Sequence, residues 1–489
     1  MAEGAKETVP SHRGTMQEPP SGFIFDYRCE PDWPPLAWLA VCRVGDPRIV
    51  VRHGPDVETR PDWFCEAVWD GDFSAGGFDQ TENVFGSGGR IRDGRVCFVS
   101  ACLTFDRLHS FHTDGLAWIS NSLACLAACL DLCFDPWYLW YHEDFSSICQ
   151  GILKHRSQVR SDRGTVQLLY HRNSEWDGAC FSVRDKPVGG ETFADFASYR
   201  HFLETVLARL DSNMRSPQRR FGYTPLSTCS SGYDSLAVTV LSRTIGNRQA
   251  LCVAHDRLYR GDSGADPVRR LGMEPLVIGR DDWRAQPFAE VPFIVGDACG
   301  RDVWLAGAQE PLHRRVLLSG KFGGAMWHVA MGHGPELGHN DPGGLSLTEY
   351  RLKAGFLHCP VPAVGARLIR DVHAISGGRE MGPWTLGGAY DRPIPRRIIE
   401  EAGIERGTFA RNKTATGIQL FRRAEFDRFL PGTDSFRDFM RWMRAQSRHR
   451  PPPASGGALE SAPRIPVEVP LFRHLFPWAL DRCKAVYAR

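Results

Sequence analysis

Apolar and polar positions change their spacing about 190 residues into the chain. Before that point, short runs rich in β-branched and aromatic residues predict strands, and the stretch 90–100 is the clearest of them. Asp93-Gly94 separates its two runs, and this dipeptide is typical of a two-residue hairpin turn. A segment rich in Leu and Ala, 122–132, predicts a helix capped by Ser122 or the residue before it. We therefore expect residues 21–188 to form a mainly β domain.

Beyond residue 190, helix and strand patterns alternate. Apolar side chains recur every three or four residues over 193–214, which predicts a helix with one buried face. Continuous apolar runs separated by helical segments then predict strands at 224–229, 250–254, 275–278 and 315–318. Such runs indicate a parallel sheet covered on both faces, so the fold class is α/β. The segment 345–445 reads as mostly helical.

Composition indicates the number of domains, the cellular compartment and the partners that the chain can have. The 489 residues suffice for two or three domains, and 59 Lys plus Arg against 57 Asp plus Glu create no field that would attract nucleic acid or an acidic membrane. The 15 scattered cysteines are typical of a reducing compartment, and no signal peptide or membrane span is visible. We expect a cytoplasmic protein without a nucleic-acid or membrane partner. Its ends read as a disordered leader (1–20), a Pro-rich linker (446–470) and a C-terminal helix (471–489).

The segment richest in candidate chemistry is Ser230-Ser231-Gly232-Tyr233-Asp234-Ser235. It lies between the predicted strand ending at Cys229 and a helix predicted to begin at Leu236. Small residues there turn backbone N–H groups toward the positive end of a helix dipole, which favours phosphate, and Asp234 could hold Mg²⁺. The alternative is an ordinary turn in which Asp234 or Ser235 caps the helix. The order strand, loop, helix favours the phosphate site.

This loop resembles the Ser-Gly-Gly-x-Asp-Ser pyrophosphate loop of the N-type ATP pyrophosphatases, and of asparagine synthetase in particular. Further on, Ser319-Gly320 followed by Gly323-Gly324 resembles the second loop of that family. Glu349-Tyr350-Arg351 is similar to its Glu-x-Arg, and Arg411-Asn412-Lys413 to its Arg-x-Lys. The resemblance covers about half the chain. It implies a Rossmann-like PP-loop sheet within an ATP-binding domain at 189–445.

Members of this family activate a carboxylate with ATP, release pyrophosphate and pass the acyl group to an amine. The resemblance therefore implies ATP and Mg²⁺, a small-molecule or peptide carboxylate, and an amine donor; it is also compatible with a homo-oligomer. It implies a catalytic Glu349, which helps to deprotonate the amine, a catalytic Lys413, which stabilises transition-state charge, and a magnesium ligand, Asp234. The residues implied to hold the nucleotide are Ser230, Ser231, Gly232, Asp234, Ser235, Ser319 and Gly320.

Three departures from the family pattern leave alternatives open. Ser231 stands where the family has its second Gly, and the second loop carries Lys321 instead of acidic residues. The segment 21–188 resembles the family's glutamine-hydrolysing domain, but residue 2 is Ala2 where that domain needs a nucleophilic Cys. The prediction is an amide ligase that uses ammonia or another amine. The alternatives are a catalytically impaired nucleotide-binding protein, a peptide or natural-product cyclase of the same fold, and a PP-loop enzyme acting on a nucleic-acid base or a sulfur carrier.

A second pattern involves sulfur. Cys125, Cys129 and Cys133 recur every four residues, so a helix would place them along one face. Metal sites usually use closer Cys-x-x-Cys pairs on loops, whereas free cysteine is a common core residue. Core packing is the favoured interpretation.

Overall fold

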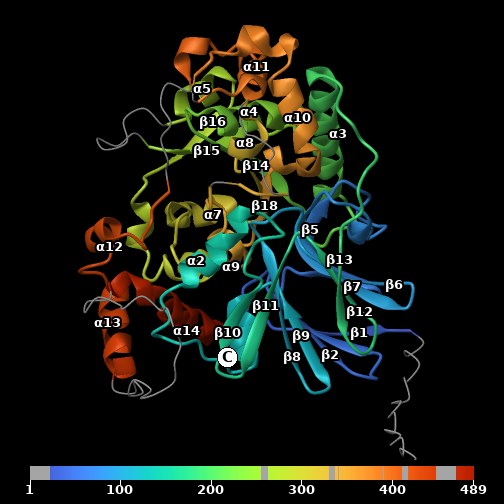
Figure 1. The fold of residues 1–489 in the computed structure, drawn as a ribbon, viewed down its shortest axis with the longest axis vertical. Helices are drawn as coiled ribbons and strands as arrows, with labels where there is room; N and C mark the ends of the chain where they lie inside the picture. The colour runs from blue at the N-terminus through green and yellow to red at the C-terminus, as the bar shows by residue number, and fades with distance from the viewer. Residues whose placement is uncertain are drawn as a thin grey trace, which may run out of the picture.

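The computed structural model describes residues 22–254, 263–329, 336–339, 341–388, 390–409, 417–447 and 470–488. The predicted leader and nearly all of the predicted linker lie outside these ranges. The described chain is mixed α/β, with a mainly β N-terminal half and a parallel sheet in the C-terminal half (Figure 1). Within the described residues, none of the helices combines the length and apolar character that crossing a bilayer requires.

Two sheets build the N-terminal half, and every strand pair in them is antiparallel except β1 with β3. Large apolar side chains from both sheets, among them Trp38, Phe64 and Trp176, share one core. The first sheet has the order β1 (Ile24–Cys29), β3 (Arg48–His53), β2 (Trp38–Arg43), β9 (Leu116–Ser120), β8 (Arg107–Thr113), β11 (Gly164–Tyr170), β10 (Gln158–Ser161). The second has the order β13 (Phe181–Arg184), β12 (Asn173–Trp176), β7 (Arg95–Val99), β6 (Val84–Arg92), β5 (Trp63–Trp69), β4 (Glu58–Arg60).

The hairpin predicted at 90–100 is confirmed. Arg92 pairs with Arg95 at the end of β6 and the start of β7. Asp93 and Gly94 both have positive φ, 50° and 70°, which a type I′ turn requires and which Asp-Gly adopts at low cost.

The third sheet is parallel throughout, with the order β16 (Glu274–Ile278), β15 (Gln249–Val253), β14 (Thr224–Cys229), β17 (Arg315–Ser319), β18 (Leu357–Pro360). Four of its strands are those predicted. The fifth, β18, falls in the stretch expected to be helical, so that expectation is wrong there. Its four buried residues are too short a run to show a period, and only pairing with β17 makes them a strand.

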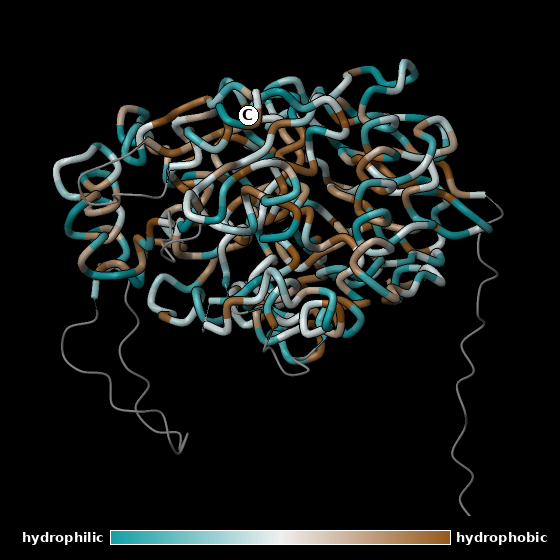
Figure 2. Tube along the Cα trace, turned by 90° about the horizontal axis from the view of Figure 1, so that it is seen from above, coloured by the Kyte–Doolittle hydropathy of each residue, from teal (hydrophilic) through white to brown (hydrophobic). Residues whose placement is uncertain are grey.

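Helices surround the parallel sheet, and others lie along one side of the N-terminal strands (Figure 1), while apolar segments run mainly through the interior (Figure 2). Their bounds are α1 (Leu123–Cys129), α2 (Tyr141–Ser146), α3 (Phe196–Met214), α4 (Tyr233–Ser242), α5 (Ala265–Arg270), α6 (Val291–Asp297), α7 (Gln309–Leu312), α8 (Gly323–Met326), α9 (Leu347–Ala354), α10 (Ile369–Ser376), α11 (Pro393–Glu401), α12 (Arg423–Phe429), α13 (Asp434–Ser447) and α14 (Leu475–Tyr487). The C-terminal helix α14 packs against α1 and α6, so the end of the chain contacts segments from much earlier in the sequence.

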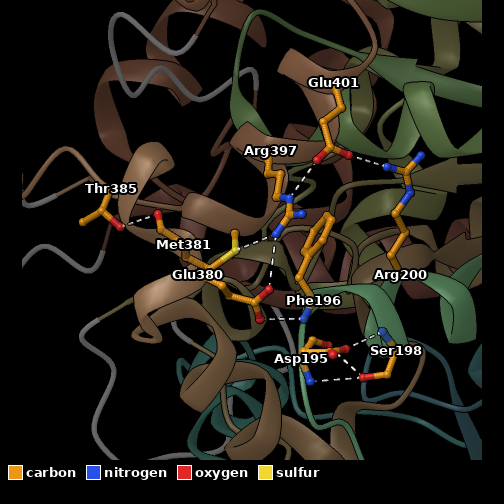
Figure 3. A network of polar contacts seen from close by, with 9 residues as sticks. All are labelled: Asp195, Phe196, Ser198, Arg200, Glu380, Met381, Thr385, Arg397 and Glu401. Carbon is orange, nitrogen blue, oxygen red and sulfur yellow. Dashed lines mark hydrogen bonds and ion pairs between the residues drawn. The ribbon is translucent and has the colours of Figure 1, made fainter.

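A network of polar contacts ties the start of α3 to α11 (Figure 3). Asp195 and Ser198 cap α3 reciprocally, as in a capping box. The Phe196 backbone N–H donates to Glu380, and Arg397 of α11 forms ion pairs with Glu380 and Glu401. The network thus holds α11, which follows Arg392 directly, against α3.

Buried charges join the two halves of the chain. Arg351 of α9 donates to Glu66 of β5 at 2.6 Å and to Asp106 at 2.9 Å, and its side chain is 1% exposed. The Glu66 carboxylate also accepts hydrogen bonds from Ser87 (2.6 Å) and Asn121 (3.2 Å). Because desolvated charges are costly unless paired, this network fixes how α9 sits on the β half.

Candidate functional site

A cavity of about 570 Å³ opens at the carboxyl ends of β14 and β17. These two strands are neighbours at the point where the strand order reverses, which is where open parallel sheets place their ligands. Six of the seven residues expected to hold a nucleotide line it, whereas Ser231 is not part of the lining. The six are Ser230, Gly232, Asp234, Ser235, Ser319 and Gly320.

The first loop is folded tightly onto the start of α4. The Ser230 backbone N–H donates to Ser235 Oγ at 3.0 Å, the two hydroxyls lie 2.8 Å apart, and the Gly232 N–H donates to Ser230 Oγ at 3.2 Å. Helix α4 begins at Tyr233 rather than at the predicted Leu236. Asp234 and Ser235 are therefore in its first turn, at the positive end of the helix dipole.

Glycines of the second loop allow it to approach the first. A Cβ on Gly320 would lie 2.5 Å from the backbone nitrogen of Ser235 and 2.6 Å from the backbone carbon of Asp234. A Cβ on Gly323 would lie 2.6 Å from Cγ of Asp234. Both contacts are closer than real Cβ atoms make, so the two loops meet only because these positions lack side chains.

Two ion pairs set the charge of the cavity wall. Arg392, which precedes α11, forms an ion pair with Asp234, and its side chain is 5% exposed. Lys321 Nζ lies 2.9 Å from Oδ1 of Asp302, whose other oxygen accepts from Ser346 Oγ at 2.8 Å. Burial acts to raise the pKa of Asp302, but the Lys321 ammonium and these hydrogen bonds outweigh it and hold the pKa below its usual value. Lys321 thus has a buried carboxylate from a distant segment as its partner.

Further residues of the wall escaped the sequence analysis. Arg301, Trp304, Asp341 and Arg392 all line the cavity. None belongs to a motif with fixed spacing, and Arg392 comes from a segment more than 150 positions after the first loop. The one local signal was Pro393, a residue that often begins a helix and so places Arg392 at a helix start.

The described residues form no ready-made site for a magnesium ion held by protein side chains alone. The Asp234 carboxylate is engaged by Arg392. Across the part of the chain that the structure describes, no group of three or more His, Cys, Asp or Glu is arranged to hold a metal. The expected role of Asp234 as a metal ligand therefore has no supporting geometry.

Glu349 lies away from this cavity. Its Oε1 accepts hydrogen bonds from the backbone N–H groups of Leu123 (2.7 Å) and Ala124 (3.2 Å), and its Oε2 accepts one from Ser122 Oγ (2.7 Å). Burial raises the pKa of this carboxylate. Glu349 thus accepts hydrogen bonds from the first turn of α1, joins the two halves of the chain and is not among the residues that line the cavity, so its catalytic role stays a prediction. Lys413 lies outside the described residues, although Gly417, four positions later, lines the cavity.

Ser319 of the cavity wall is held from behind by a buried imidazole. Its Oγ lies 2.7 Å from Nε2 of His358, a residue of β18. Burial lowers the pKa of His358 to about 4, so the ring is neutral near pH 7. The missed strand β18 therefore supplies the group that orients the hydroxyl of Ser319.

We expect His358 to make the folded protein sensitive to mild acid. Its pKa is about 4 in the folded state against 6.5 when unfolded, so between these values the unfolded state binds the extra proton. Stability should fall as pH drops from 6.5 to 4, by about 3 kcal/mol from this residue alone. Urea unfolding of the wild type and of His358→Gln across pH 4.5–7 measures this, and the variant should show the shallower pH slope. Equal slopes would contradict the prediction.

Comparison with known proteins found no family model that matches the chain and no matching protein among the curated ones. The interpretation of the cavity therefore depends on its own geometry and chemistry.

Proposed function

We propose that the chain is an ATP-dependent ligase of the asparagine synthetase type, which joins a carboxylate to an amine or to ammonia through an acyl-adenylate. The observation that carries the proposal is the meeting of two loops, after β14 and β17, around one cavity at the reversal of the parallel sheet. The cavity volume of about 570 Å³ suits a drug-sized or nucleotide-sized ligand.

The cavity offers donors suited to phosphate oxygens. Ser230, Ser235 and the first residues of α4 line the cavity, and the first backbone N–H groups of a helix have no acceptor within the helix itself. Lys321 and Arg392 line the same cavity, each paired with a carboxylate, Asp302 and Asp234 respectively. Preorganised donors and cations in a water-poor site favour the charge that develops on a phosphoryl group as it transfers.

The proposed reaction consumes one ATP, one carboxylate and one amine or ammonia. A carboxylate oxygen of the substrate attacks the α-phosphorus, the bond to the bridging oxygen of the β-phosphate breaks, and pyrophosphate leaves. An amine then attacks the activated carbonyl carbon, the bond to the adenylate oxygen breaks, AMP leaves, and the nitrogen loses a proton to a water molecule. Lys321 and Arg392 would exchange their carboxylate partners for the leaving phosphates during the first step.

A second candidate, a protein that binds nucleotide without turning it over, is favoured by the Asp234–Arg392 ion pair. Magnesium usually binds through one or two carboxylates plus substrate phosphates. A carboxylate already neutralised by a guanidinium is a poor ligand for that ion. This candidate predicts binding of ATP without release of pyrophosphate.

Pyrophosphate release distinguishes the two candidates. The full chain is incubated with ATP, Mg²⁺ and a panel of carboxylates and amines, and binding of ATP is measured by calorimetry. We expect release that Asp234→Ala lowers about a hundredfold or more, because the variant removes the carboxylate that positions Arg392 and the side chain against which Gly323 packs. Asp266→Ala is the control, since that carboxylate is 78% exposed on α5, and it should leave release unchanged. Binding without release would favour the second candidate, and no binding would contradict both.

A further inference from the structure

Three cysteines lie close together in sequence in the N-terminal half, outside the cavity, and two of them, Cys125 and Cys129, are of interest here. Cys125, Cys129 and Cys133 follow one another along α1 and just beyond it, and they differ in exposure: Cys125 is buried, Cys129 is partly buried and Cys133 is exposed. They do not line the cavity. The predicted core role is confirmed for Cys125, and Cys129 packs against the edge of the same core, whereas the exposed Cys133 is not part of it.

A guanidinium is aimed at the sulfur of Cys129. Arg52, on β3, donates from Nη1 to Cys129 Sγ at 3.5 Å. Its Nε is held by Oε1 of Glu30 at 2.7 Å, and its Cζ lies 4.6 Å from the centre of a Trp33 ring. Because the carboxylate and the indole both hold the guanidinium, its position against the sulfur does not depend on the sulfur alone.

The surroundings of Cys129 favour its thiolate. The neighbouring Cys125 thiol lowers the pKa of Cys129; burial opposes this, and the charge of Arg52 adds to the lowering. Glu30 is the one facing carboxylate, and it acts in the opposite direction. Burial instead raises the pKa of both Cys125 and Cys133. A thiolate next to a cation, with partial access to solvent, is the environment of a reactive cysteine.

We propose that Cys129 is a peroxide-reactive thiol and that Cys125 resolves its oxidised form. The Cys129 thiolate attacks one oxygen of hydrogen peroxide, the O–O bond breaks, and the departing hydroxide takes up a proton to become water, leaving a sulfenic acid. The Cys125 thiol then attacks that sulfur and loses its proton, the S–O bond breaks, and water leaves as the disulfide forms. The peroxide supplies both oxidising equivalents.

The position of the pair at a helix end makes the second step accessible. Residues four apart on a helix lie on one face, yet their Cβ atoms are farther apart than the roughly 4 Å that a disulfide needs. Cys129 is the last residue of α1. Only the final turn has to loosen, and helix ends loosen more readily than helix interiors.

The test uses the full chain at pH 7 with limiting hydrogen peroxide and peptide mass spectrometry. We expect the peptide that contains both cysteines to lose two hydrogens, and to do so about tenfold faster than Cys180 is oxidised. Cys180 is the internal reference because it is exposed and its sulfur faces Asp177 instead of a cation. In Cys125→Ser, dimedone should trap a sulfenic acid at Cys129.

Arg52→Met should slow the oxidation of Cys129 about tenfold, while Arg52→Lys should restore part of the rate because it keeps the charge. The matched control is Arg28→Met on the neighbouring strand β1, where Arg28 is 60% exposed and forms an ion pair with Asp26. Near-ultraviolet circular dichroism checks that each variant is folded. The proposal is overturned if Cys129 reacts no faster than Cys180, if no adduct forms in Cys125→Ser, or if both Arg52 variants react like the wild type.

Discussion

Replacing Gly320 by alanine is expected to weaken binding of ATP to the cavity by about a hundredfold or more. The added Cβ would lie 2.5 Å from the backbone nitrogen of Ser235 and 2.6 Å from the backbone carbon of Asp234. Backbone atoms inside a helix turn cannot move aside as the end of a flexible side chain can, so the second loop would have to withdraw from α4. That movement displaces Ser319 and Lys321 from the wall they share with the first loop. Calorimetric titration of the full chain with ATP measures the loss.

The matched control for Gly320→Ala is Gly77→Ala. A Cβ on Gly77 would meet no atom within 4 Å, and its φ of −84° is open to any residue. This variant should bind ATP as the wild type does. Gly323→Ala should resemble Gly320→Ala, because its Cβ would lie 2.6 Å from Cγ of Asp234. If Gly320→Ala binds with unchanged affinity, the two loops do not jointly form the binding site.

Arg351→Met is expected to lower the free energy of unfolding by about 3–5 kcal/mol. The substitution keeps much of the side-chain volume but leaves Glu66 and Asp106 without their cation, and the Glu66 side chain is 0% exposed. Burial already raises the pKa of Glu66, and without Arg351 only its hydrogen bonds to neutral groups would offset the cost of the charge. Urea unfolding monitored by tryptophan fluorescence measures the change.

Two further variants distinguish the cost of leaving buried carboxylates without a cation from the effect of removing an arginine in general. Arg163→Met removes an exposed ion pair with Asp131 and should change stability by less than about 1 kcal/mol. The triple variant Arg351→Met, Glu66→Gln, Asp106→Asn should recover most of the loss, because the buried carboxylates are then neutral. A triple variant as unstable as Arg351→Met would assign the loss to packing around α9.

Local signals explain which elements could be predicted. Asp93-Gly94 specified its hairpin because few other dipeptides tolerate positive φ at both positions. Ser122 was foreseen as a cap, and its Oγ accepts from the Cys125 N–H at 2.9 Å. The start of α4 was predicted three residues late. Apolar periodicity begins only at Leu236, whereas the polar residues Asp234 and Ser235 already lie in the first turn.

In the candidate site, too, some residues could be predicted from local sequence and others could not. The first loop was recognisable because its donors are consecutive in the chain. Arg392 and Asp302 could not be recognised from the sequence. Nothing in the residues around them shows that Arg392 pairs with Asp234 or that Asp302 pairs with Lys321. The burial of Glu349 against α1 was equally hidden, because it depends on how α9 meets the N-terminal half.

The amino-acid sequence by itself determined the mainly β first half, four strands of the parallel sheet and the small-residue loop after β14, because periodicity, turn chemistry and caps act over a few neighbouring residues. Only the tertiary structure determined the fifth strand and the ion pairs of Asp234 and Lys321. It also determined the hydrogen bonds between Glu349 and α1 and the placement of Arg52 against Cys129. Each of these depends on burial and on charges brought together from distant segments, and desolvation makes such contacts strong only once the fold has excluded water.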